Sequence, residues 1–175
     1  MLIESLLGLD LTDIDVMYFG LLKSDLDTYI DENELLKKLH TFFSKEIKIF
    51  ILSKPTQNQP EAVYKLIQHF QIKGSIFVKD IDTFFEHKIK NENYICYIEI
   101  KKDMVLGNVS EKSFIEYNNL YEVINICEKK IISPYISVGG YSFENASWFV
   151  KSFEKLNTMR INKNQLYISH VIYYL

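Results

Sequence analysis

The stretch VMYFGLL, residues Val16–Leu22, is a continuous run of apolar residues rich in strand formers. A strand with one solvent-facing side alternates apolar and polar residues, whereas a strand covered on both faces is apolar throughout. The run therefore indicates a buried strand in an α/β sheet. Residues 47–52 and 75–78 are two further short apolar runs of the same kind.

Helical signals separate these three runs. Asp31 followed by Glu34 forms a capping-box pattern and predicts a helix that continues to about Lys45. Pro60 suits a first helical turn and predicts a second helix through about Phe70. Strands that alternate with helices in this order are joined by right-handed crossovers. We therefore expect the three strands to lie parallel in one sheet.

The second half of the chain has a different rhythm. Its apolar segments at residues 94–100, 113–117, 123–127 and 138–143 are separated by short turns, which is typical of strands and of antiparallel pairs. Asn145 can cap a further helix, and residues 166–175 have a helical pattern. The sequence thus predicts one α/β domain over residues 1–175, with a Rossmann-like mixed, mainly parallel sheet, helices on both faces and a strand-rich second half.

Composition and charge narrow the classes of partner. Of the 175 residues, 47% are hydrophobic and 25% are charged, which is the balance of a packed globule. A net charge of −3 provides no broad attraction for nucleic acid or anionic lipid. No apolar stretch approaches the roughly 18–20 residues of a membrane helix, and no basic region precedes the first apolar residues. We expect a cytoplasmic protein without nucleic-acid or membrane partners.

Two candidate ligand sites follow predicted strands, because ligands of open α/β sheets bind beyond the carboxyl ends of the strands. Backbone amides of the loop at residues 56–62 could bind a base or a phosphate, although an ordinary connection would have the same composition. Asp80 and Asp82 could hold a hard cation that bridges to phosphates, or they could form a solvated turn.

A third candidate combines charged residues with glycines. Glu128 could accept a hydrogen bond from a ligand hydroxyl while Lys129 binds a phosphate, and the neighbouring Gly139 and Gly140 permit close approach of the backbone. The alternative is an exposed charged turn before a bulged strand. The four histidines lie in no recognisable nucleophile context, so serine-histidine-aspartate catalysis has no support.

Five segments, taken in chain order, resemble those of a known family. They are residues 59–62 (QPEA), Asp80 with Asp82, Glu128 with Lys129, residues 139–143 (GGYSF) and residues 166–169 (LYIS). In this order and spacing they resemble the nucleotidyltransferase family that includes the sugar-nucleotide pyrophosphorylases. The resemblance extends over nearly the whole chain.

The resemblance implies roles for individual residues. Asp82 would be the catalytic residue and would bind Mg²⁺. Gln59, Asn58 and Asp80 would bind the nucleotide, with Asn58 at a position where the family has glycine. Glu128, Lys129 and Gly140 would bind the acceptor.

The resemblance also implies a reaction. The partners would be a nucleoside triphosphate and a small phosphorylated acceptor, and a nucleoside monophosphate would pass to a sugar phosphate or similar phosphate ester during assembly of a surface polysaccharide such as a capsule. The alternative is a non-catalytic α/β protein with a binding, regulatory or immunity-type role.

Two parts of the family pattern have no counterpart in these 175 residues. Family members have a first strand with a Gly-rich loop that wraps the triphosphate, and a second metal-binding aspartate beyond the Tyr-Ile-Ser segment. We therefore expect an incomplete active site with little or no transfer activity. We also expect a gap in the sheet, filled by another strand of the chain or by a second molecule, for example in a homodimer.

Overall fold

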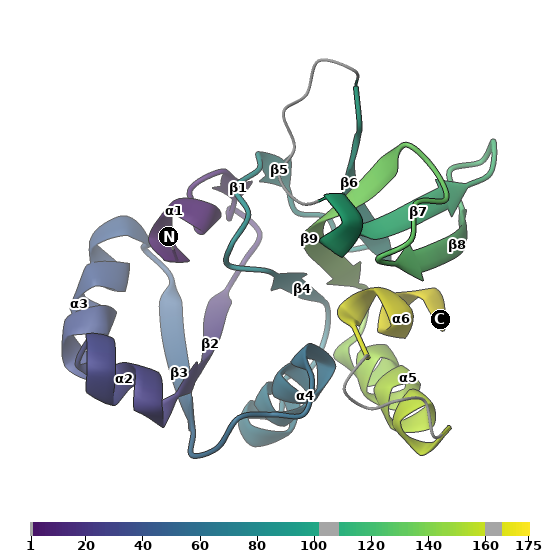
Figure 1. The fold of residues 1–175 in the computed structure, drawn as a ribbon. Helices are drawn as coiled ribbons and strands as arrows, with labels where there is room; N and C mark the ends of the chain where they lie inside the picture. The colour runs from purple at the N-terminus through teal and green to yellow at the C-terminus, as the bar shows by residue number, and fades with distance from the viewer. Residues whose placement is uncertain (1, 102–108, 160–165) are drawn as a thin grey trace.

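The computed structural model describes residues 2–101, 109–159 and 166–175 as a mixed α/β fold (Figure 1). In the first half, helices and strands are interspersed: α1 (Leu2–Leu6), β1 (Leu9–Asp10), β2 (Val16–Leu22), α2 (Lys23–Tyr29), α3 (Glu32–Phe42), β3 (Glu46–Leu52), α4 (Gln59–Phe70) and β4 (Ile76–Lys79). The second half holds β5 (His87–Lys88), β6 (Tyr94–Glu99), a 3₁₀ turn (Val109–Glu111), β7 (Ser113–Tyr117), β8 (Val123–Glu128), β9 (Tyr135–Phe143), α5 (Ala146–Thr158) and α6 (Ile168–Tyr173).

The three longest helices begin where side chains accept hydrogen bonds from their first amides, as predicted for Asp31 and Asn145. Asp31 accepts hydrogen bonds from the backbone amides of Asn33 and Glu34 at 2.9 and 3.3 Å. Asn58 caps α4, with Pro60 in the first turn, and Asn145 caps α5. These helix starts are therefore set by local sequence.

The strands form three sheets, and the prediction of one mainly parallel sheet is wrong. β2 and β3 pair in parallel over their full length, as predicted, and β1 pairs in parallel with β5. The largest sheet has the order β4-β9-β7-β8, with β6 also on β9, and all its pairs are antiparallel. The predicted third parallel strand, β4, lies in this antiparallel sheet, because an apolar run reports burial and specifies neither the partner nor the direction of a strand.

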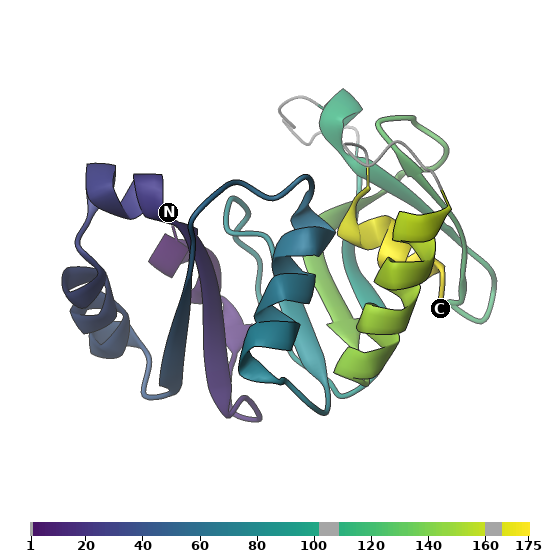
Figure 2. The ribbon, with the colours of Figure 1, turned by 90° about the horizontal axis from the view of Figure 1, so that it is seen from below.

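Two apolar clusters stabilise the fold. The larger one packs α4, α5 and α6 against the antiparallel sheet and contains the fully buried Phe143, Phe149 and Ile168. The smaller one joins α1, β1, β2 and α3, together with Ile89 just after β5, around Leu39. Helices α4 and α5 lie side by side (Figure 2), and the rings of Tyr64 and Phe153 meet at 4.9 Å between their centroids.

None of the described helices is both long enough and apolar enough to span a lipid bilayer.

The large cluster should carry much of the stability. We expect Phe149→Ala to lower the free energy of unfolding by about 3–5 kcal/mol, because the buried ring packs edge-on against Phe143 and its removal leaves a cavity. Phe42→Ala, at an exposed position on α3, is the matched control and should change stability little. Urea unfolding followed by circular dichroism measures both values, and equal losses would contradict this assignment of the core.

Candidate functional site

A cavity of about 230 Å³ lies at the end of β4 and is formed by segments that are far apart in the sequence. Its walls come from the start of α4, the turn after β4, the strands β7 and β9, and the end of β8. The lining residues include Gln59, Asp80, Asp82, Glu128, Gly139 and Tyr141. The structure thus brings together Gln59, Asp80, Asp82 and Glu128 from the predicted set.

Asp80 is held from two sides at the end of β4. Its backbone amide donates to the carbonyl oxygen of Gly139 at 2.8 Å, and the Gln59 side-chain amide donates to its Oδ1. Burial raises the pKa of Asp80 to about 6, against the lowering effect of the Gln59 hydrogen bond, and the neighbouring Asp82 raises it further. The carboxyl group is therefore poised to change its charge below neutral pH.

Gly139 lets β9 approach this carboxyl group. Its φ of +77° lies in the left-handed region, and a Cβ built there would lie 2.5 Å from Oδ2 of Asp80. A side chain at Gly139 would both strain the backbone and displace Asp80.

Lys79 braces the turn that carries both aspartates. Its ammonium donates to the carbonyl oxygens of Asp80 and of Thr83, the latter at 2.5 Å, and lies 4.6 Å from the centre of the Phe85 ring. Burial lowers the pKa of Lys79, while Asp80 and Asp82 oppose this effect. Asp82 itself is exposed at the cavity and accepts a 3.2 Å hydrogen bond from Thr83 Oγ1.

Glu128 is oriented by two serine hydroxyls. Ser113 Oγ donates to its Oε1 at 2.6 Å across the β7–β8 pair, and Ser169 Oγ of α6 donates to the same oxygen. Among the described residues, no hydrogen bond reaches the other oxygen, Oε2. This leaves one carboxylate oxygen of a fixed side chain for a ligand in the cavity.

Tyr141 adds a neutral wall. Ser137 Oγ donates a hydrogen bond to its phenol oxygen at 3.0 Å. Burial raises the pKa of Tyr141 well above its usual value, so the phenol group stays protonated and uncharged.

Three predicted site residues lie outside this cavity. Lys129 is exposed, and its ammonium lies 2.5 Å from Oε2 of Glu111. Gly140 is a packing position, because a Cβ there would lie 2.7 Å from Phe85 and 2.9 Å from Sγ of Cys96. Asn58 caps α4 and lines a second cavity instead.

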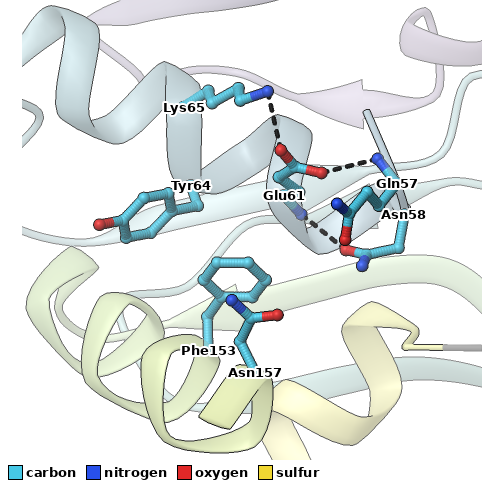
Figure 3. Close-up of a pocket in the computed structure, with 7 residues that line it drawn as sticks. All are labelled: Gln57, Asn58, Glu61, Tyr64, Lys65, Phe153 and Asn157. Carbon is cyan, nitrogen blue, oxygen red and sulfur yellow. Dashed lines mark hydrogen bonds and ion pairs between the residues drawn. The ribbon is translucent and has the colours of Figure 1, made fainter. Parts of the chain in front are cut away.

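The second cavity, of about 190 Å³, lies between the start of α4 and α5 (Figure 3). The Glu61 carboxylate accepts hydrogen bonds from the backbone amide of Gln57 at 2.6 Å and from the Lys65 ammonium at 2.8 Å, and Phe153 lies below. Its charged groups pair with one another, so the cavity of Asp80 and Asp82 is the better candidate for a charged ligand.

Several residues that line the cavity of Asp80 and Asp82 had no predicted role. Ser113 and Ser137 were not predicted, Tyr141 belongs to the GGYSF segment of the resemblance without a role of its own, and Gly139 was expected, with Gly140, to permit close approach of the backbone. The Gly-Gly pair was a usable signal for Gly139. Ser113 had no signal, because its position opposite Glu128 depends on the register of β7 and β8.

The carboxylates fit a magnesium ion that is shared with a ligand. No cluster of three histidine, cysteine or acidic side chains suited to a metal occurs among the described residues. Magnesium is usually bound through one or two carboxylates together with waters and substrate phosphates. Asp80 and Asp82 match that open arrangement better than a complete protein cage.

Comparison with solved structures defines the class of fold as nucleotidyltransferase-like. A nucleoside-diphosphate-sugar pyrophosphorylase from Vibrio cholerae RC9 superposes on 94% of this chain, over 69% of its own length, with a TM-score of 0.74 and 20% identity. An inositol-1-phosphate CTP transferase from T. maritima superposes on 90% of this chain, over 60% of its own length, with a TM-score of 0.61 and 12% identity. No family model matches the sequence, and no curated protein gives a significant match.

The raised pKa of Asp80 should make the free energy of unfolding depend on pH. A folded-state pKa of about 6 lies above the usual 3.8, so the folded state binds this proton more tightly and the free energy of unfolding falls as pH rises through this range. Asp80→Asn keeps an acceptor for Gln59 and should abolish that fall. Urea unfolding in metal-free buffer at a series of pH values measures it, with Asp27→Asn, an exposed position, as control. A fall retained by the Asp80 variant would assign the titration to another group.

Removal of the Lys79 ammonium should loosen the turn at residues 80–83. We expect Lys79→Met to lower the free energy of unfolding by about 1.5 kcal/mol, because two carbonyl oxygens lose a charged hydrogen-bond donor. Hydrogen exchange of the turn amides should become faster, whereas Lys73→Met, at an exposed position, should leave it unchanged. Unchanged exchange in the Lys79 variant would show that the turn is held by other contacts.

Proposed function

We propose that this chain binds a nucleoside triphosphate with Mg²⁺ together with a small phosphorylated acceptor, as a domain of the nucleotidyltransferase type. The observation that carries the proposal is the convergence of Gln59, Asp80, Asp82 and Glu128 on one cavity in a nucleotidyltransferase-like fold. Asp80 and Asp82, which could hold a cation that bridges to phosphates, and Glu128, which could accept a hydrogen bond from a hydroxyl group, line the same cavity. Two ligands of different chemistry can therefore meet there.

The charge of the cavity supports a role for a divalent cation. The carboxylates of Asp80, Asp82, Glu111 and Glu128 line it, and Lys112 contributes the single ammonium among the lining residues. A bare polyphosphate would be repelled by this set. A magnesium ion held by Asp82, with Asp80 beside it, would reverse the local charge and bridge to phosphate oxygens.

The wall around Glu128 suits a ligand with several hydroxyl groups. Its Oε2 can accept a hydrogen bond from the ligand, while the hydroxyls of Ser137 and Tyr167 line the same cavity. Neutral donors and one oriented carboxylate are the groups that recognise a sugar or polyol. The acceptor in this proposal is therefore a sugar phosphate or a similar phosphate ester.

The proposed reaction transfers a nucleoside monophosphate. An oxygen of the acceptor phosphate forms a bond with the α-phosphorus of the triphosphate, the bond from that phosphorus to the oxygen bridging to the β-phosphate breaks, and pyrophosphate leaves. An acceptor phosphate is already ionised at neutral pH, so no side chain has to remove a proton. The side chains align the two phosphates and compensate their charge. A role in surface-polysaccharide assembly stays a prediction of the resemblance.

The test is magnesium-dependent binding of nucleotides, measured by calorimetry with each common nucleoside triphosphate. We expect Asp82→Asn to weaken binding at least about tenfold, because one lost charge-assisted contact is worth about 1.5–3 kcal/mol. Asp27→Asn, an exposed aspartate on α2, is the matched control and should bind as the unaltered chain does. Equal binding by the Asp82 variant would remove this residue from the site.

Pyrophosphate release with a panel of sugar and alcohol phosphates then separates binding from transfer. For the 175-residue chain the resemblance predicts weak release or none. Binding of triphosphate without magnesium, or no binding at all, would contradict the proposed function.

A further inference from the structure

Strand β9 has a bulge beside the candidate cation site. Two consecutive residues of β6 pair with Ser137 and Gly140, so residues 138–139 are an insertion in β9 relative to β6. Bulges of this kind bend a strand and change the direction of its neighbouring groups, and they are frequent next to functional sites. Gly139, the second inserted residue, is the one that lies against Asp80.

The hydroxyl group of Ser137 closes this bulge. The backbone amide of Gly139 donates to Ser137 Oγ at 3.2 Å, and Ser137 Oγ donates to the phenol oxygen of Tyr141 at 3.0 Å. Both side chains are buried, with 7% of Ser137 and 4% of Tyr141 exposed. The hydroxyl group accepts one hydrogen bond and donates another, so its orientation is fixed from two sides.

The closed bulge supports Asp80 through the Gly139 backbone. The carbonyl oxygen of Gly139 accepts a hydrogen bond from the Asp80 amide at 2.8 Å, and Oδ2 of Asp80 lies 2.5 Å from the point where a Cβ on Gly139 would stand. A rotation of the peptide units around Gly139 would therefore release the Asp80 amide and change the space beside its carboxyl group. The contacts form one series from Tyr141 through Ser137 and Gly139 to Asp80.

A second buried serine of β9 has a different surrounding. Ser142 directly follows Tyr141, so its side chain faces the other side of the sheet, and its Oγ donates to the carbonyl oxygen of Lys90 at 3.1 Å. Ser137 instead lines the cavity of Asp80 and Asp82. The two serines share strand, burial and type of side-chain hydrogen bond, and only Ser137 is bonded to the bulge.

We propose that Ser137 is a positioning residue of the cation site, because its hydroxyl group holds the Gly139 backbone in the conformation that places the carboxyl group of Asp80 in the cavity. Ser137 acts through Gly139 and does not itself bind the cation. The inference rests on the proposed function, since it concerns the site at which Mg²⁺ and the triphosphate would bind. Groups that orient a metal ligand typically contribute about 10- to 100-fold to metal affinity.

The first measurement needs no ligand. Ser137→Ala removes the acceptor of the Gly139 amide, so in metal-free buffer hydrogen exchange at Gly139 and Asp80 should become about tenfold faster relative to the rest of β9. Ser142→Ala is the matched control, because it also removes one hydrogen bond of a buried serine to a backbone group. It should leave the relative exchange of these two amides unchanged.

The second measurement is the magnesium requirement of nucleotide binding. Each common nucleoside triphosphate is titrated into the chain by calorimetry at a series of Mg²⁺ concentrations. Ser137→Ala should raise the Mg²⁺ concentration for half-maximal binding about tenfold, and Ser142→Ala should not change it. Tyr141→Phe keeps the ring and removes the oxygen that accepts from Ser137, so it should change both measurements in the same direction by a smaller factor.

The outcomes separate this inference from the proposed function. If the unaltered chain shows no magnesium-dependent binding, both are contradicted. If it binds and the Ser137 variant has the same Mg²⁺ requirement, only the positioning role is overturned, even where exchange at Gly139 is faster. Unchanged exchange, or equal effects in the Ser142 variant, would also overturn it. If Ser137→Ala does not fold, the same two measurements on Tyr141→Phe decide, and unchanged values there overturn the inference.

Discussion

The antiparallel pairing of β4 with β9 is the constraint on which the candidate site depends. It sets Lys79 opposite Gly140, so that the next residue, Asp80, bonds through its amide to Gly139. The turn after β4 then points both aspartates into the space between α4 and β8. A shift of one residue in this register would turn the carboxyl group of Asp80 toward the core and leave the cavity without its acidic wall.

Local chemistry made part of the fold predictable. Capping residues such as Asp31 and Asn145 act on amides two or three positions away, so the helix starts could be found from the sequence. The parallel pairing of β2 and β3 could be predicted from the helix expected after Asp31, although the structure has two helices, α2 and α3, between these strands. The partner of β4 could not be found, because β9 begins 56 residues after the end of β4 and nothing in either segment encodes the pairing.

The candidate site, like the fold, could be predicted from the sequence only in part. Gln59, Asp80, Asp82 and Glu128 were placed from strand ends and from the family resemblance, and the fold gathers them around one cavity. The family resemblance assigned Gly140 to the acceptor, whereas Gly139 is the glycine that lines the cavity. Because successive residues of a strand face opposite sides of the sheet, Gly139 lies against Asp80 and Gly140 lies against Cys96.

The Glu128 carboxylate has a consequence for the order in which the chain matures on the ribosome. One of its two donors, Ser169, lies 41 residues further along the chain. A nascent chain that has emerged only as far as β9 can already pair Ser113 with Glu128, yet it lacks α6. The hydrogen bonds to Glu128 are therefore completed only after α6 has emerged, and a chain that has emerged as far as β9 holds this glutamate by one hydroxyl alone.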